Sequence, residues 1–209
     1  MAGRPREFDR EQALLQARDL FWERGYEGVS MADLVQKLGV ASARIYAAFG
    51  SKEALFRATV AHYEAHDGGF AERALREEPT ARRAIERVLN DAVETYTRPD
   101  GPKGCMVVSA ATNCTDENDA VLAWLAQHRK ARTDCIIERV RQAVRDGELS
   151  AQTDVESLGD YFATLLHGLS VQARDGASRE KLAEIGRLAM RAWPASNARR
   201  PSQLGRNRR

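Results

Sequence analysis

Apolar residues recur along most of the chain at the three- and four-residue spacing that places them on one face of a helix. The first such face consists of Ala13, Leu14, Ala17, Leu20 and Phe21. β-Branched and aromatic residues do not alternate with polar residues over the length of a strand. The pattern therefore predicts an all-α protein.

Capping residues and glycines set the expected ends of the first helices. Asp9, Ser30 and Ser51 are typical N-caps, and Gly25 and Gly39 typically end a helix. These positions predict helices over about residues 10–24, 31–38 and 42–49, and a fourth helix that begins after residue 51.

The helices after residue 51 are expected to be longer. The fourth continues to about residue 78, although Gly68 and Gly69 weaken it by about 1 kcal/mol each against Ala. Proline and glycine residues at 99–102 mark a break, and Thr153 with Glu156 forms a capping box. The remaining helices are expected at about residues 80–98, 105–112, 117–146, 154–173 and 178–193, which makes nine in all.

The composition is that of a globular protein, with 209 residues of which 43% are hydrophobic and 30% charged. No apolar run approaches the roughly 18 residues of a membrane span, and no apolar segment follows the charged N-terminus as in a secretory signal. The three cysteines, Cys105, Cys114 and Cys135, are too few and too unevenly spaced for a disulfide framework. These features predict a cytoplasmic protein with no membrane partner.

The net charge of +2 hides an uneven distribution. Residues 1–64 carry nine basic and nine acidic side chains, and residues 65–193 carry 18 basic and 21 acidic ones. Residues 194–209 carry five arginines, no acidic residue and one large apolar residue, Leu204. This last segment is therefore expected to be a disordered basic tail, either solubilising or in contact with DNA phosphates.

The third expected helix has only two turns and contributes little to a core. It follows the second helix after a short turn that contains Gly39, which is the spacing of a helix-turn-helix motif. Inward packing is expected of Ala32, Leu34, Val35, Leu38, Val40, Ile45 and Phe49. That leaves Ser42, Arg44, Tyr46 and Ala48 at or near the outer face. Residues 39–52 hold two basic residues and no acidic one, which favours an interface with nucleic acid.

The N-terminal residues resemble the DNA-binding domain of the TetR family of transcriptional regulators over about residues 8–60. The matching positions are residues 20–34, Gly39, Val40, Ile45, Tyr46, Phe49, Lys52, Glu53, Leu55 and Phe56. The resemblance implies a homodimer that binds a palindromic double-stranded DNA operator. It also implies that the protein usually represses and leaves the operator when a small-molecule inducer binds. The implied domains are a helix-turn-helix head at 1–52 and a ligand-binding and dimerisation body at 53–193, followed by the tail at 194–209.

Five residues are expected at the DNA. Arg44 is the base-reading candidate, because a guanidinium can donate two hydrogen bonds to guanine O6 and N7. By the resemblance, Tyr46 bonds a phosphate, and Lys52 lies in the first turn of the fourth helix, where backbone N–H groups also favour phosphate. Ser30 and Ser42 are expected as N-caps that also meet backbone oxygens. The alternatives are a pure cap for Ser30, a half-buried ring for Tyr46 and a solvated charge for Arg44. For Lys52 the alternative is half of a charge pattern with the adjacent Glu53.

The chain after residue 60 is expected to hold the ligand and the dimer interface. Side chains with aromatic or polar tips that can line a ligand site are Tyr63, Phe70, Tyr96, Cys105, Trp124, His128, Phe162 and His167. For each of them a core or surface role is the alternative. Apolar residues of the last two helices that suit a dimer interface are Leu158, Tyr161, Phe162, Leu165, Leu169, Ile185, Leu188, Ala189 and Trp193.

Cys105 supports a second hypothesis, because it follows a Pro/Gly loop and opens a short apolar segment beside Lys103. A thiol in the first turn of a helix is more acidic and more reactive, so Cys105 is a candidate sensor of oxidants or electrophiles. A small buried hydrophobe is the alternative. No motif of a hydrolase, nucleotide-binding enzyme or metalloprotease is present, and no cofactor or metal site is expected. A helical interaction module that uses the basic tail and binds no DNA is the remaining alternative.

Overall fold

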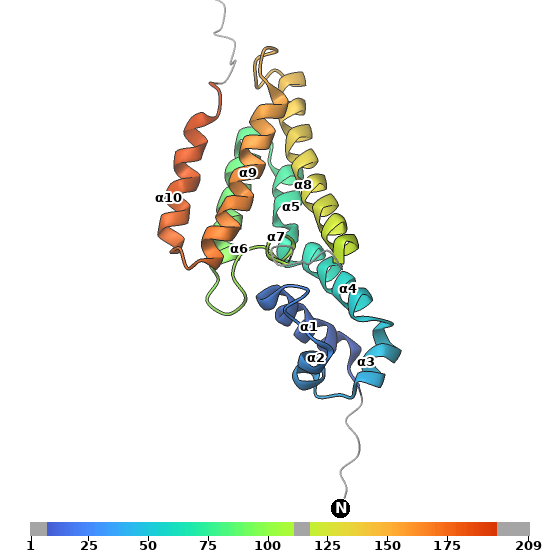
Figure 1. The fold of residues 1–209 in the computed structure, drawn as a ribbon. Helices are drawn as coiled ribbons and strands as arrows, with labels where there is room; N and C mark the ends of the chain where they lie inside the picture. The colour runs from blue at the N-terminus through green and yellow to red at the C-terminus, as the bar shows by residue number, and fades with distance from the viewer. Residues whose placement is uncertain (1–7, 111–117, 196–209) are drawn as a thin grey trace, which may run out of the picture.

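The computed structural model describes residues 8–110 and 118–195. Over these residues the chain forms ten α-helices and no strand, which confirms the all-α class (Figure 1). The helices are α1 (Arg10–Arg24), α2 (Met31–Leu38), α3 (Ser42–Phe49), α4 (Lys52–Ala65), α5 (Phe70–Glu77), α6 (Ala81–Thr97), α7 (Met106–Ser109), α8 (Asp119–Arg145), α9 (Val155–Arg174) and α10 (Arg179–Ala189). Two short 3₁₀ segments are η1 (Asp67–Gly69) and η3 (Met190–Ala192). The expected tail lies almost wholly outside the described residues.

Helices α1 to α3 form a small head at one end of the molecule, and α4 leads from it into the larger body (Figure 1). The local sequence explains where the helices of the head begin and end. Ser30 and Asp33 form a capping box at the start of α2, and Gly39 ends α2 in the left-handed conformation that favours glycine. Leu34 and Ile45 are buried between these helices, which holds α3 against the head.

Two of the expected N-caps and one residue expected to pack inward are wrong. The N-cap of α3 is Ala41, which makes no side-chain cap bond, and Ser42 is the first helical residue. The N-cap of α9 is Asp154, because its carboxylate accepts hydrogen bonds from the backbone N–H and the hydroxyl of Ser157, so Thr153 does not cap that helix. Ala32 is exposed rather than packed inward.

The expected fourth helix is two helices, because the chain leaves the helical conformation at His66. Gly68 and Gly69 form η1 and then α5 begins, which brings the described total to ten helices instead of nine. A Cβ on Gly68 would lie 2.3 Å from the ring of Tyr63. The turn therefore packs so closely against that ring that only glycine fits at position 68.

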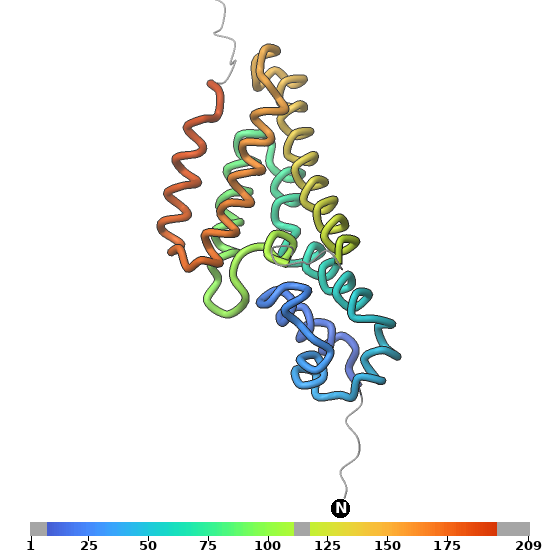
Figure 2. Tube along the Cα trace, in the orientation of Figure 1, coloured from blue at the N-terminus to red at the C-terminus, as the bar shows by residue number. Residues whose placement is uncertain are grey.

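The body is a bundle in which α9 packs against α6 and α8, and α5 packs against the same two helices. Helix α7 lies at the end nearest the head, and α10 lies along one flank (Figure 2). Its core is apolar and contains Leu89, Val140, Phe162 and Leu166, each almost wholly buried. Among the described residues, none of the helices combines the length and the apolar composition that a membrane span requires.

Candidate functional site

Helix α3 presents a basic and aromatic outer surface at the end of the head farthest from the body (Figure 1). Ile45 and Phe49 are buried, whereas Arg44 and Tyr46 are exposed, Tyr46 by 46% of its surface. At 3.6 residues per turn, Arg44 and Tyr46 point about 160° apart around the helix axis. They therefore lie on opposite flanks of the outer face, separated by the exposed Ala43 and Ala47. A helix with small residues at its centre and polar side chains at both flanks can approach a groove closely.

Cation–aromatic contacts hold the arginines near α3. The guanidinium of Arg44 lies 5.6 Å from the ring centre of Phe8, and that of Arg10 lies 4.8 Å from the ring centre of Phe49. Arg10 also donates to the carbonyl oxygen of Ala48 over 3.4 Å. Arg10 was not among the residues expected at the DNA, although the sequence already placed it in the first turn of α1.

Ser30 and Ser42 are both exposed, but their surroundings differ. The hydroxyl of Ser30 accepts from the backbone N–H of Asp33 over 3.1 Å, and the Asp33 carboxylate accepts from the Ser30 backbone N–H over 2.8 Å. These bonds from Ser30 hold the pKa of the Asp33 carboxyl below its usual range. Ser30 therefore acts as a cap in this structure, whereas Ser42 stands in the first turn of α3 without capping it.

Lys52 is the first residue of α4 and is half-buried. Its ammonium group lies 4.3 Å from the ring centre of Tyr26. The hydroxyl of Ser51 accepts from the Ala54 backbone N–H over 3.0 Å, so Ser51 caps this helix as expected. The helix start thus places a cation and helix N–H groups at the surface of the head beside α3.

Four of the eight expected ligand-site residues lie in the core where the body meets the head. Tyr63, Tyr96 and Cys105 have no exposed surface, and Phe70 is 2% exposed. The rings of Phe70 and Tyr96 meet edge to face with centres 5.7 Å apart. The structure brings these four together, as a set of buried side chains around the thiol.

Arg132 of α8 is a charged residue within this buried set, and it was not among the residues expected there from the sequence. It is only 7% exposed, and its Nη1 lies 3.5 Å from the sulfur of Cys105. Its Nη2 donates to the carbonyl oxygen of Gly68, also at 3.5 Å. Its spacing in the sequence could have indicated that it is buried, because Arg132 stands between Leu125 and Ile136 on the apolar stripe of α8.

The electrostatics around the thiol favour its ionised form. Burial by itself raises the pKa of the Cys105 thiol, but the Arg132 charge and the Tyr63 hydroxyl outweigh burial and hold that pKa below its usual value. The cation that acts on the thiol is therefore Arg132 and not the expected Lys103, whose ammonium group binds the carbonyl oxygens of Thr97 and Arg98. The backbone N–H of Val108, in the first turn of the four-residue helix α7, adds to this lowering of the Cys105 pKa after Arg132 and Tyr63.

The other four expected ligand-site residues lie apart from the thiol or only near its edge. His128 contacts the Glu64 carboxylate at 2.9 Å, and its ring packs against that of Trp124 on the same helix. Phe162 packs against Trp193 at the far side of α9. His167 is half-buried, and burial with the charges of Arg132 and Arg129 lowers its pKa to about 4.

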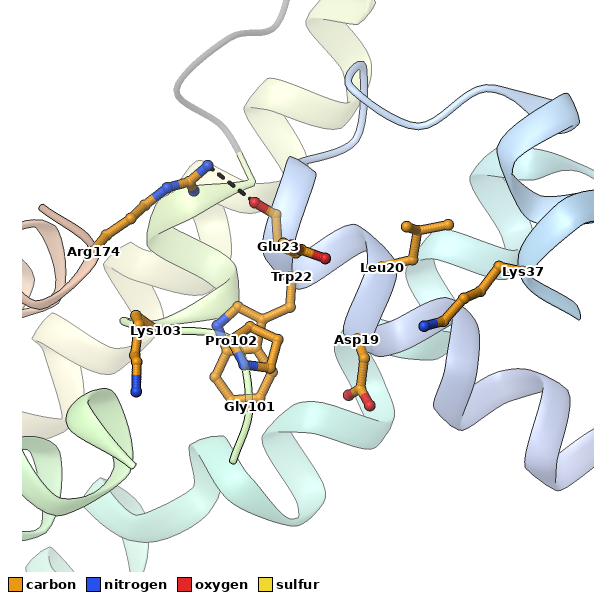
Figure 3. Close-up of a pocket in the computed structure, with 9 residues that line it drawn as sticks. All are labelled: Asp19, Leu20, Trp22, Glu23, Lys37, Gly101, Pro102, Lys103 and Arg174. Carbon is orange, nitrogen blue, oxygen red and sulfur yellow. Dashed lines mark hydrogen bonds between the residues drawn. The ribbon is translucent and has the colours of Figure 1, made fainter. Parts of the chain in front are cut away.

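A cleft of about 460 Å³ separates the head from the body (Figure 3). Lys37 of α2 lies on the head side, and Lys103 with Arg174 lies on the body side. Arg174, the last residue of α9, closes part of the cleft by donating to the carbonyl oxygen of Glu23 over 3.2 Å.

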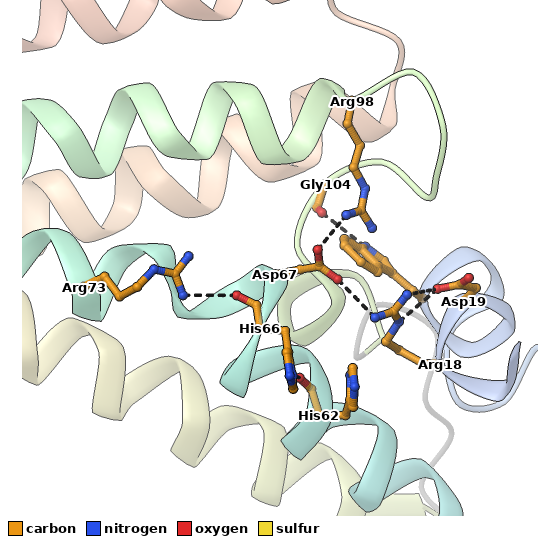
Figure 4. Close-up of polar contacts among 9 residues, drawn as sticks. Arg18, Asp19, His62, His66, Asp67, Arg73, Arg98 and Gly104 are labelled. Atoms are coloured by element: carbon orange, nitrogen blue, oxygen red, sulfur yellow. Dashed lines mark hydrogen bonds and ion pairs between the residues drawn. The ribbon is translucent and has the colours of Figure 1, made fainter. Parts of the chain in front are cut away.

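Asp67 joins the head to the body at the η1 turn (Figure 4). Its carboxylate binds Arg18 of α1 at 3.2 Å and Arg98, which follows α6, at 2.7 Å. The stacked rings of His62 and His66, 4.1 Å apart, lie beside this pair. Burial and then the neighbouring His66 lower the pKa of His62. Among the residues with described positions, no three His, Cys, Asp or Glu side chains are placed to share a metal ion.

Comparisons with known proteins match both parts of the chain. Residues 13–59 match the family model "Bacterial regulatory proteins, tetR family", and residues 79–189 match "Tetracyclin repressor-like, C-terminal domain". The chain is 33% identical to the HTH-type transcriptional repressor ComR of Escherichia coli over 92% of each chain. It is 29% identical to the repressor BdcR of Escherichia coli over 90% of each chain.

A solved structure carries the same fold together with DNA. It is the TetR family regulator CifR with substitutions at three cysteines, in complex with a 26-bp double-strand operator. The two chains are 44% identical with a TM-score of 0.87, over 92% of this chain and all of that one. With both domain models and the fold in agreement, the chain belongs to the TetR family of transcriptional regulators, which are DNA-binding proteins and not enzymes.

Proposed function

We propose that this chain is a cytoplasmic repressor that binds a palindromic operator as a dimer and leaves it when a small molecule binds the body. The observation that carries the proposal is the outer face of α3, where Arg44 and Tyr46 flank a strip of exposed alanines. In this proposal the head at 1–52 binds DNA, and the body at 53–193 dimerises and senses. The operator-bound relative and the repressors ComR and BdcR support it.

Each head residue has a proposed role at the DNA. Arg44 reads a base, preferably guanine, from one flank of α3, and Tyr46 bonds a phosphate from the other flank. Lys52, with the N-terminus of α4, binds a second phosphate. Ser42 lies in the first turn of α3, where its hydroxyl can reach the DNA backbone. The Ser30 hydroxyl is used in capping, so Ser30 contributes only by fixing the position of the backbone where α2 begins.

The proposed dimer interface is the exposed apolar surface of α9 and α10. Tyr161 is 43% exposed and Leu188 is 56% exposed, which is unusual for such large apolar side chains. Val171 of α9 is also exposed, by 43%. A second copy of the chain seated there forms a four-helix interface, and its two-fold symmetry requires an inverted repeat in the operator.

The proposed ligand acts on the body where α4, α6, α7 and α8 meet. Tyr63, Phe70 and Tyr96 supply apolar walls there, and Cys105 and His167 supply polar tips. Trp124 and His128 of α8 contact Phe56 and Glu64 of α4, and Phe162 of α9 packs against Trp193. These three are therefore second-rank candidates for ligand contact.

Selection of bound sequences from random DNA tests the proposed function. The expected product is an inverted repeat, bound more weakly as salt rises, because phosphate contacts release counterions. Fluorescence anisotropy on the selected duplex and on a scrambled duplex of equal length then measures specificity. Equal affinity for both duplexes would contradict the proposed operator binding.

A second candidate function is thiol-based sensing through Cys105. The specific observation is the buried contact of 3.5 Å between its sulfur and Arg132. Release of the operator by a thiol-reactive compound in the native chain, but not in Cys105→Ser, tests this candidate.

A further inference from the structure

We propose that Arg132 and Cys105 form a buried guanidinium–thiolate pair that captures small α,β-unsaturated carbonyl compounds. We further propose that loss of the sulfur's negative charge releases the head. This inference rests on the proposed sensing role of Cys105, and it adds the reactive class, the assisting residues and the route to the DNA-binding head.

Charge balance is the first argument. Arg132 is 7% exposed, and no carboxylate in the described part of the chain forms an ion pair with it. A buried cation without a counter-ion is strongly unfavourable. Cys105 lies 3.5 Å from Nη1 and is the group there that can carry a negative charge by losing a proton. Both groups are thus stabilised when the sulfur is a thiolate, which is the reactive form of cysteine.

Unpartnered hydroxyls are the second argument. The hydroxyl oxygens of Tyr63 and Tyr96 and the Nε of Arg132 are buried and make no hydrogen bond of ordinary geometry in the described residues. Burial and then the Cys105 charge raise the pKa of both phenols, so both remain protonated donors beside the sulfur. Two phenol hydroxyls and a guanidinium around a nucleophile are suited to a compound that develops an oxyanion when it is attacked.

The chemical step balances without any further reagent. The thiolate sulfur of Cys105 bonds to the β-carbon of the unsaturated carbonyl, and the C=C electron pair moves to give an enolate. The enolate oxygen receives hydrogen bonds from the tyrosine hydroxyls. The α-carbon of the enolate then takes one proton from the Tyr63 hydroxyl. Water then returns a proton to Tyr63, and the hydroxide that this leaves is neutralised by the proton that the Cys105 thiol had released to solvent. The product is a neutral thioether, and nothing is oxidised or reduced.

The position of Arg132 links this step to the head. Its two contacts, Cys105 and the Gly68 carbonyl, each adjoin a residue that holds the head. Gly104, next to Cys105, accepts a hydrogen bond from Trp22 of α1, and Asp67, next to Gly68, binds Arg18 of α1 (Figure 4). A neutral thioether leaves the Arg132 charge without its anion, so Arg132 must move or gain water. This change reaches the head because Gly104 and Asp67, which hold it, are each one residue from a group that contacts Arg132.

The test uses the full-length chain with Cys114→Ser and Cys135→Ser, so that Cys105 is its one thiol. Intact-mass measurements give the rate of adduct formation with methyl vinyl ketone and with iodoacetamide. A cysteine of ordinary pKa, about 8.5, slows by nearly a hundredfold from pH 8 to pH 6. We expect a clearly smaller change than this for Cys105, and at least about a tenfold slower reaction at pH 6 after Arg132→Met. Arg129 and His167 also lie near this pair, so His167→Gln is measured alongside to show that the profile does not come from that imidazole.

The tyrosines are tested by the ratio of the two rates. Iodoacetamide loses iodide and forms no enolate, so Tyr63→Phe with Tyr96→Phe should slow methyl vinyl ketone at least about tenfold more than iodoacetamide. If Arg132→Met does not fold, Arg132→Lys retains the charge without the planar fork and should give an intermediate rate. An unmodified Cys105, or a rate that neither Arg132 variant changes, overturns the proposal.

Operator affinity separates this inference from the proposed function. The adduct should bind the selected operator at least about tenfold more weakly, whereas Cys105→Ser treated with the same reagent should bind as before. An adduct that forms as expected but binds DNA with full affinity overturns the proposed release. A chain that binds no operator before treatment contradicts the proposed function instead, while the adduct chemistry is still measured by mass.

Discussion

The indole Nε1 of Trp22 donates a buried hydrogen bond of 3.1 Å to the carbonyl oxygen of Gly104. Trp22 belongs to α1 of the head, whereas Gly104 precedes the thiol of Cys105 in the body. Trp22 also packs edge to face against Tyr63, with ring centres 4.7 Å apart. One side chain of the head therefore contacts both the loop and the aromatic ring that surround the thiol.

Trp22→Phe should lower the free energy of unfolding by about 1–3 kcal/mol, because the buried Gly104 oxygen loses its donor. Chemical denaturation followed by circular dichroism measures the change. Trp124→Phe is a matched control, since Trp124 is only partly buried and its indole makes no hydrogen bond in the described residues. Equal losses in the two variants would contradict a specific role for the Trp22 bond.

Arg44→Ala and Lys52→Ala should weaken DNA binding in different ways. The loss of Arg44 should cost about 1–3 kcal/mol on the operator and little on a scrambled duplex, because the side chain reads a base. The loss of Lys52 should weaken both duplexes alike and reduce the salt dependence by about one counterion, because the side chain meets a phosphate. Anisotropy titrations at several salt concentrations measure both effects.

Lys130→Ala is the control for this pair, since Lys130 is an exposed lysine of the body. It should leave affinity for both duplexes unchanged. If Arg44→Ala weakens the operator and the scrambled duplex by the same factor, Arg44 contacts the backbone and does not read a base.

The head was predictable from sequence because its determinants are local. Ser30, Gly39 and Ser51 act within one helical turn of where they stand, and all three end or begin helices as expected. Ser42 misled the expectation because a serine cap and a serine in the first turn of a helix give the same sequence pattern. The adjoining Ala41 has the extended backbone of a cap without a side chain that marks it.

The thiol site was only partly predictable because its determinants are far apart in the sequence. Cys105 drew attention through its neighbours, but its cation, Arg132, is 27 residues away. The break at Gly68 depends on the ring of Tyr63 five residues earlier, a packing contact that no helix propensity reports. Lys103 is close to Cys105 in the sequence, yet its ammonium group binds the carbonyl oxygen of Thr97 at the end of α6.

Gly68→Ala should lower the free energy of unfolding by about 1–3 kcal/mol, as is usual for an overpacked core. The new Cβ would lie 2.3 Å from the Tyr63 ring, so the ring or the η1 turn must shift. Gly186→Ala is the matched control, because a Cβ there would make an ordinary contact of 3.7 Å with Leu89. That variant should be neutral or slightly stabilising, since Ala has the better helix propensity. A Gly68→Ala protein as stable as the Gly186→Ala protein would contradict the close packing.

Stability should fall as the pH is lowered from about 6.5 toward 4, in part because of His167. Burial and the charges of Arg132 and Arg129 lower its pKa to about 4 in the folded chain, so the unfolded chain takes up the proton first. The neutral ring therefore favours the folded state fully above about pH 6.5, and this advantage decreases below that pH. His167→Gln should reduce the slope of unfolding free energy against pH in this window. Between pH 7 and 8 the two proteins should have parallel profiles, and an unchanged slope at low pH would contradict the lowered pKa.

Leu188→Asp should separate the dimer and weaken operator binding together. Leu188 is 56% exposed on α10, and a charge there would have to be buried against the second copy of the chain. Sedimentation equilibrium should show a shift from dimer to monomer at micromolar concentration, and affinity for the inverted repeat should fall at least about tenfold, since each half-site is then bound singly. Gln127→Asp on the exposed side of α8 adds the same charge away from this surface and should leave both properties unchanged. A Leu188→Asp protein that remains a dimer would place the interface elsewhere on the body.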